Sequence, residues 1–184
     1  MDHVLISCRV FLGLVFVLSF TGKVRGRAAY RAFRDSVREL APWLPGGGAA
    51  LTAAAVTVLA AESVSVVLLA VPSTGSALAG FLLATGLLGA FTVAIAGTVR
   101  RGDRVACRCF GAASSAPVGA AQLVRNGLLL AGALTGVCAA LTGGGPGVPL
   151  AGAAVALVFG AAAAGLVLLT DDLSQLLRPL GHHS

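Results

Sequence analysis

The sequence predicts an all-α fold: a polytopic bundle of about five transmembrane helices plus one amphipathic helix, in a single domain spanning residues 1–184. The composition leads to this prediction. Hydrophobic residues make up 57% of the chain and charged residues only 11%, whereas a soluble domain carries roughly 25% charged residues. The mean hydropathy is +0.94. A chain of this kind is expected to be embedded in a lipid bilayer.

Five long apolar runs supply the predicted spans, near residues 4–20, 49–71, 76–99, 120–141 and 148–170. Each is close to the length of about 17–25 residues that a membrane-crossing helix needs. The first run is followed by basic residues and lacks a small-residue cleavage site, so we interpret it as a retained span and not as a signal peptide. The spans are rich in glycine and alanine, which permits close helix packing in lipid.

Residues 23–40 interrupt this pattern and predict a short basic amphipathic helix. Apolar side chains recur there every three or four residues, which places them on one helical face: Tyr30, Phe33, Val37 and Leu40. Arginines occupy another face: Arg27, Arg31, Arg34 and Arg38. Such a helix is expected to lie in the membrane interface with its apolar face in the lipid. The alternative is a solvated helix that packs on its own bundle.

The basic residues predict an orientation in the cytoplasmic membrane. With the N-terminus outside and the C-terminus inside, every lysine and arginine except Arg9 lies at the inner side. This orientation puts the loop of residues 100–119 in the cytoplasm. The net charge of +6 is therefore explained by topology, and with 5% aromatic residues we expect no nucleic-acid partner.

That loop contains the main functional candidate, Cys107-Arg108-Cys109-Phe110-Gly111. Two cysteines one residue apart can close a small, strained disulfide, and strained disulfides exchange readily. Arg108 and the nearby basic cluster Arg100, Arg101 and Arg104 should favour the reactive thiolate. The pattern indicates thiol–disulfide chemistry at a membrane. The alternative is a loop with two incidental cysteines.

Two further cysteines have similar predicted depths. In the orientation given above, Cys8 on the first span and Cys138 on the fourth both lie near the outer face, where they could form a second pair. Arg9 would favour the thiolate of Cys8. The alternative is that both are small buried apolar residues. The cysteine and histidine spacing matches no zinc motif, so we predict no metal site.

Polar residues within the spans are also candidates. Glu62 lies near the middle of the second span, where a carboxylate is expensive and usually functional, and we expect it to carry protons. The alternative is a structural hydrogen bond to Ser63, Ser65 or a neighbouring helix. Arg125-Asn126 opens the fourth span, and Arg125 would either anchor the interface or approach the C-x-C loop as a positive neighbour.

Taken together, these residues resemble the methylamine-utilisation MauE family within the wider DoxX-like membrane proteins. The matching elements are Phe20-Thr21-Gly22-Lys23, the basic helix with Phe33, Glu62, Cys107-x-Cys109-Phe110-Gly111 and Arg125-Asn126. The family usually has glycine between the two cysteines, where this chain has Arg108. The resemblance implies a redox-associated protein that acts with a thioredoxin-like partner in disulfide formation or maturation of an enzyme outside the cytoplasm.

The implied outward function and the predicted inward C-x-C can be reconciled by a relay to Cys8 and Cys138 or by a re-entrant loop. We therefore expect a thiol–disulfide oxidoreductase, and the sequence identifies no cofactor for it. Two alternatives stay open at this stage. One is a quinone-coupled, disulfide-forming bundle of the DsbB or vitamin K epoxide reductase type, and the other is a non-enzymatic membrane scaffold that holds a redox partner.

Overall fold

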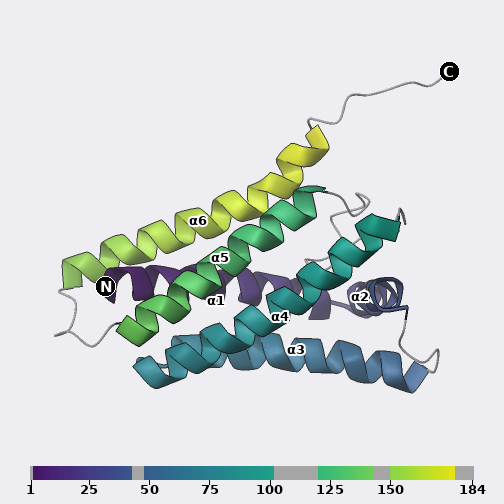
Figure 1. Cartoon of the computed structure of the whole chain (residues 1–184), viewed down its shortest axis with the longest axis horizontal. Coiled ribbons are helices and arrows are strands. Elements are labelled where there is room, and N and C mark those ends of the chain that lie inside the picture. The colour runs from purple at the N-terminus through teal and green to yellow at the C-terminus, as the bar shows by residue number, and fades with distance from the viewer. Residues whose placement is uncertain (1, 43–47, 102–119, 143–149, 177–184) are drawn as a thin grey trace.

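A computed structural model describes residues 2–42, 48–101, 120–142 and 150–176 (Figure 1). These residues form helices and no strand, which confirms the all-α prediction. The helices in chain order are α1 (Asp2–Val24), α2 (Arg27–Leu40), α3 (Gly48–Ala70), α4 (Thr74–Arg101), α5 (Ala120–Thr142) and α6 (Leu150–Leu176).

The chain is a multi-pass membrane protein. Four described helices are long and apolar enough to cross a bilayer: α1, α3, α4, and α5 over Gln122–Thr142. Helix α6 has 27 residues, and a shorter apolar stretch, Ala154–Leu166, is described within it, so a fifth span stays a prediction. Large apolar side chains such as Val93 (73% exposed) and Phe159 (69% exposed) cover the outside of the bundle. An outward apolar surface of this kind suits contact with lipid tails.

Helix α1 is the central helix of the bundle, because it packs against α3, α5 and α6 (Figure 1). The other main helix pairs are α3 with α4 and α4 with α5. One apolar core joins these helices, and its most buried large side chains are Leu12, Val15, Phe16, Phe81, Leu88 and Leu129.

Small residues let the helices approach closely. A Cβ atom added to Gly160 of α6 would lie only 2.7 Å from the backbone oxygen of Ser7 in α1. One added to Gly132 of α5 would lie 2.8 Å from the Phe11 ring. In lipid, where apolar tails compete with apolar side chains, such close packing is a main source of helix association.

Helix α2 crosses one end of the bundle. Figure 1 shows it end-on, whereas α1 and α3 run across the picture. Phe33 and Val37 are buried against Ala55 of α3, and Leu40 packs against Ile95 of α4. The prediction that these apolar side chains enter the lipid is therefore wrong for Phe33, Val37 and Leu40. They contact the bundle instead, while the arginine face stays at the surface.

The helix directions bring most of the basic residues to the end of the bundle that α2 covers. There α1 and α4 end, and α3 and α5 begin (Figure 1). The loop that carries Cys107, Arg108 and Cys109 connects α4 to α5, and these three residues lie outside the described residues. The two helices that hold the loop therefore meet it at the α2 end.

The contact between α1 and α6 gives a stability prediction. Replacing Gly160 with alanine forces a Cβ against a backbone atom that cannot rotate away, at a cost of about 1–3 kcal/mol. Because alanine also favours the helix by about 1 kcal/mol, we expect a net loss of up to about 2 kcal/mol and a lower thermal midpoint in detergent, followed by circular dichroism.

Gly165→Ala, in the same helix, is the matched control. A Cβ at Gly165 meets nothing within 4 Å, so this variant should be as stable as the parent or slightly more stable. Equal midpoints for the two variants would show that the close approach of α6 to α1 is not a packing constraint.

Candidate functional site

A buried ion pair lies where α1, α2, α3 and α4 meet. Lys23 and Glu62 are 1% and 2% exposed, and the Lys23 Nζ atom forms a salt bridge with Glu62 Oε1. Lys23 Nζ also donates a hydrogen bond to Ser19 Oγ at 2.9 Å. The Ser19 hydroxyl in turn donates to Glu62 Oε1 at 3.2 Å. The three side chains therefore form a closed triangle that joins α1 to α3.

Helix geometry explains how α1 supplies two members of this triangle. Ser19 and Lys23 are four residues apart, so they lie one above the other on a single helical face. Toward the N-terminus of α1 the same face carries Leu12 and Phe16, both of which are buried in the core. Lys23 was expected to begin the basic helix of residues 23–40. Instead α1 continues to Val24, which turns Lys23 into the bundle.

Aromatic rings complete the surroundings of the ammonium group. Lys23 Nζ lies 4.9 Å from the centroid of the Phe33 ring and 6.0 Å from that of Phe91. A cation over a ring face is attracted by the ring quadrupole, most strongly where water is excluded. Phe33 thus packs α2 against both the apolar surface of α3 and the charge of Lys23. Lys23 therefore pairs with Glu62 and, through its contact with Phe33, also holds α2 against the bundle.

The second carboxylate oxygen of Glu62 can still accept hydrogen bonds. Glu62 Oε2 is buried, and it accepts no hydrogen bond from any of the described residues. Of the structural partners expected for Glu62, the neighbouring helix supplies the bonds, through Lys23 and Ser19 of α1. The Ser63 and Ser65 hydroxyls donate instead to the carbonyls of Leu59 and Ala61. The pair can therefore hold a proton at Oε2, or bind a small donor there, without losing its bond to Lys23.

Polar side chains of α5 lie at the same end of the bundle. Asn126 is buried and donates through Nδ2 to the Leu88 carbonyl at 3.2 Å and to Thr92 Oγ1 at 2.9 Å. Arg125 is only 5% exposed. Arg125 lies near the start of the apolar span Gln122–Thr142, and both of its interpretations, an interface anchor or a positive neighbour of the C-x-C loop, stay predictions. A buried arginine is rare in lipid and usually functional.

The remaining candidates lie toward the opposite end (Figure 1). Arg9 donates to the carbonyls of Val71, at 2.8 Å, and Ser73, and it therefore ties α1 to the turn between α3 and α4. Cys8 is half-buried beside the core, and Cys138 is exposed on α5. Both are free thiols, and no disulfide joins them in this structure.

The structure thus puts Glu62 at the centre of a site whose other members were not predicted as site residues: Ser19, Lys23, Phe33 and Phe91. Lys23 and Phe33 were noted among the residues that carry the family resemblance. A signal was present. One face of the first span changes from apolar to polar along its length. It carries residues at helical spacing: Leu12 and Phe16, then Ser19 and Lys23. A carboxylate in a membrane span needs a cation nearby, and this pattern could have identified Lys23 as that cation.

The ion pair predicts strong energetic coupling. Removing one partner of a buried pair leaves an uncompensated charge and costs about 3–5 kcal/mol, so Lys23→Met should lower stability by that order. Adding Glu62→Gln to Lys23→Met should recover part of the loss. Thermal unfolding of the two single variants and the double variant measures the coupling.

Glu39→Gln is a matched control, because Glu39 is exposed on α2 and should change stability by less than about 0.5 kcal/mol. If the losses from Lys23→Met and Glu62→Gln simply added, the two groups would not stabilise each other.

Comparison with curated proteins and with solved structures gave no match. One family model does match: methylamine utilisation protein MauE, over residues 1–139. The matched region is more than half of the chain, and it includes both the Lys23–Glu62 pair and the C-x-C element. The chain belongs to the MauE family of methylamine-utilisation membrane proteins.

Proposed function

We propose that this protein is a membrane thiol–disulfide oxidoreductase that exchanges disulfides with a thioredoxin-like partner through Cys107 and Cys109. Its role would be to support disulfide formation or maturation of a partner protein. The observation that carries the proposal is the C-x-C element in a chain of the MauE family. The buried polar groups near the ends of α4 and α5, which hold this element, support it.

The proposed step is a pair of thiolate attacks. A partner thiolate attacks one sulfur of the Cys107–Cys109 disulfide and forms a mixed disulfide, while the other cysteine leaves as a thiolate. A second partner thiolate then attacks the mixed disulfide, so the partner gains a disulfide and the C-x-C pair holds two thiols. Two electrons pass from partner to C-x-C, and the reverse sequence reduces a partner disulfide.

Each cycle also moves protons, because thiols release them on oxidation. We assign Glu62 as the group that takes up or returns a proton, since Oε2 is free of hydrogen bonds from the described residues. Lys23 would keep the carboxylate available by balancing its charge. Arg108, between the two cysteines, and Arg125, at the start of α5, would favour the thiolate form.

Cys8 and Cys138 are proposed as a second, outer pair that passes electrons onward, with Arg9 modulating Cys8. The free thiol of each and the shared end of the bundle are compatible with this role. A span is about 30 Å thick and exchange requires sulfur contact, so such a relay also requires the C-x-C loop to enter the bundle.

The central prediction is a trapped intermediate. In Cys107→Ser, the single Cys109 thiolate can attack the disulfide of an oxidised thioredoxin-like partner, but no Cys107 thiolate is present to complete the reverse sequence and release the reduced partner. A covalent adduct with the oxidised partner should therefore accumulate on non-reducing gels. Cys107→Ser/Cys109→Ser should give no adduct and no disulfide transfer. The matched control, Cys8→Ala/Cys138→Ala, keeps the C-x-C pair and separates the outer thiols from the exchange.

Each alternative has its own outcome in this experiment. Full maturation of the partner by Cys107→Ser/Cys109→Ser would overturn the redox proposal and indicate a scaffold. Re-oxidation of the C-x-C pair only when a quinone is added would indicate a quinone-coupled mechanism. Unchanged disulfide transfer by Cys8→Ala/Cys138→Ala would rule out the outer relay and would leave the C-x-C pair as the only proposed exchanging pair.

We further predict that the N-terminus lies outside and the α2 end lies inside. The reason is that lysine and arginine gather at the α2 end, and such charges are retained in the cytoplasm. A membrane-impermeant thiol reagent applied from the outside should therefore fail to label Cys107 and Cys109 in a Cys8→Ala/Cys138→Ala background. Labelling of these cysteines from the outside would show that the protein has the opposite orientation.

A further inference from the structure

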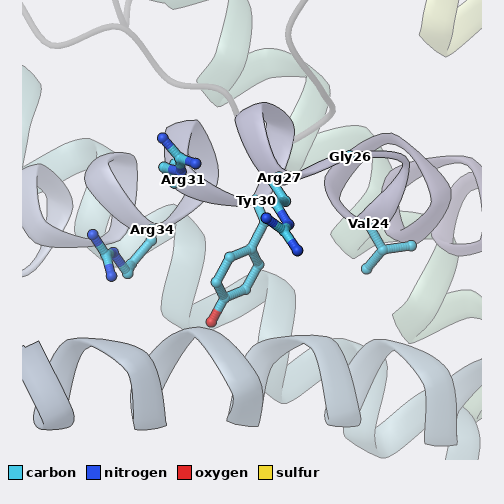
Figure 2. A pocket seen from close by; sticks show the side chains of 6 residues that line it. All are labelled: Val24, Gly26, Arg27, Tyr30, Arg31 and Arg34. Atoms are coloured by element: carbon cyan, nitrogen blue, oxygen red, sulfur yellow. The ribbon is translucent and has the colours of Figure 1, made fainter.

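A basic pocket lies at the bend between α1 and α2. It has a volume of about 670 Å³, and its lining residues are Val24, Gly26, Arg27, Tyr30, Arg31 and Arg34. Figure 2 shows the Tyr30 ring pointing from α2 toward α3, with Arg27 and Arg34 on either side of it. Three guanidinium groups, one phenol and one valine therefore surround a single space. None of these residues belongs to the Lys23–Glu62 site.

The spacing of the arginines explains why they share this pocket. Arg27, Arg31 and Arg34 follow each other at intervals of four and three residues, which places them on one face of α2. Like charges at this spacing disfavour a helix, so the arrangement costs stability unless an anion is present. No acidic side chain forms a salt bridge with any of the three within the described residues.

One donor in the pocket is already withdrawn from solvent. Arg34 Nε is buried, and no described residue accepts a hydrogen bond from it. A guanidinium presents its donors as a planar fork, which matches the oxygens of a phosphate group. The pocket thus offers directed donors as well as positive charge, and phosphate is the anion whose geometry those donors fit.

The position of the pocket indicates which kind of molecule would bring the phosphate. Helix α2 lies across the end of the apolar helices, so the pocket lies at the level where those helices leave the hydrocarbon region (Figure 1). Val24, at the end of α1, gives the pocket an apolar wall. A phospholipid brings its phosphate to this level and places its glycerol and upper acyl carbons beside such a wall.

We propose that the pocket binds the phosphate of an anionic phospholipid, held by Arg27, Arg31 and Arg34 with the Tyr30 hydroxyl as a further donor. The apolar face of α2 packs on the bundle and is therefore covered by protein. The bound lipid contacts the opposite face of α2, which carries the arginines. The bound headgroup neutralises the repulsion among the three arginines.

The test titrates the purified full-length chain, in uncharged detergent, with phosphatidylglycerol or with phosphatidylcholine of the same acyl chains, followed by native mass spectrometry. Phosphatidylglycerol should bind more tightly. Arg31→Gln should weaken it roughly fivefold, and Arg27→Gln/Arg31→Gln/Arg34→Gln roughly a hundredfold. Arg38→Gln is the matched control, because Arg38 is an exposed arginine of the same helix that does not line the pocket.

An effect of Arg31→Gln equal to that of Arg38→Gln would overturn the proposal, because a diffuse basic surface and not a pocket would then hold the lipid. Equal binding of the two lipids would also overturn it. Added inorganic phosphate should displace the lipid only weakly, and binding of phosphate as tight as that of phosphatidylglycerol would assign the pocket to a soluble phosphate instead. Unchanged helicity by circular dichroism shows that the single variants are folded.

Discussion

The buried ion pair of Lys23 and Glu62 is the interaction on which the arrangement of one whole end of the bundle depends. A charge in a membrane protein needs a partner at hydrogen-bonding distance, and here each of the two charges is the partner of the other. The pair joins the last turn of α1, which ends at Val24, to the middle of α3. It also draws Phe33 over the ammonium, which fixes where α2 must cross.

The opposite end satisfies the same rule with backbone groups. Arg9 donates to the carbonyls of Val71, directly after α3, and Ser73, directly before α4. Both carbonyls also accept backbone N–H groups, from Ser73 and Ala77 respectively. The Ser73 hydroxyl accepts from the Ser76 backbone N–H and so caps the start of α4 at 3.1 Å. Helix α1 is therefore tied to α3 at both ends, by side-chain charge at one end and by a guanidinium on carbonyls at the other.

The sequence was sufficient to predict the helical bundle, because apolar runs and basic connections are properties of local composition. Tertiary contacts decided the remainder. Periodicity showed that Phe33, Val37 and Leu40 share a face, but it could not tell whether lipid or Ala55 and Ile95 would cover that face. Glu62 was recognisable as unusual from its depth alone, whereas Lys23 looked like part of a basic segment until its pairing across 39 residues was visible. The motif Cys107-x-Cys109 remains a sequence prediction, because its residues lie outside those described.

The central position of α1 has a consequence for assembly in the membrane. Of the described helices, α1 is synthesised before all those that pack around it, and its neighbour α6 is synthesised after the other five. Between these events the face of α1 that receives Gly160 is open to lipid, and Lys23 lacks its native partner Glu62 until α3 has been made. Helix α1 therefore enters the membrane with an unpaired lysine near its end, and α6 can cover the open face of α1 only after the helices described before it have been made.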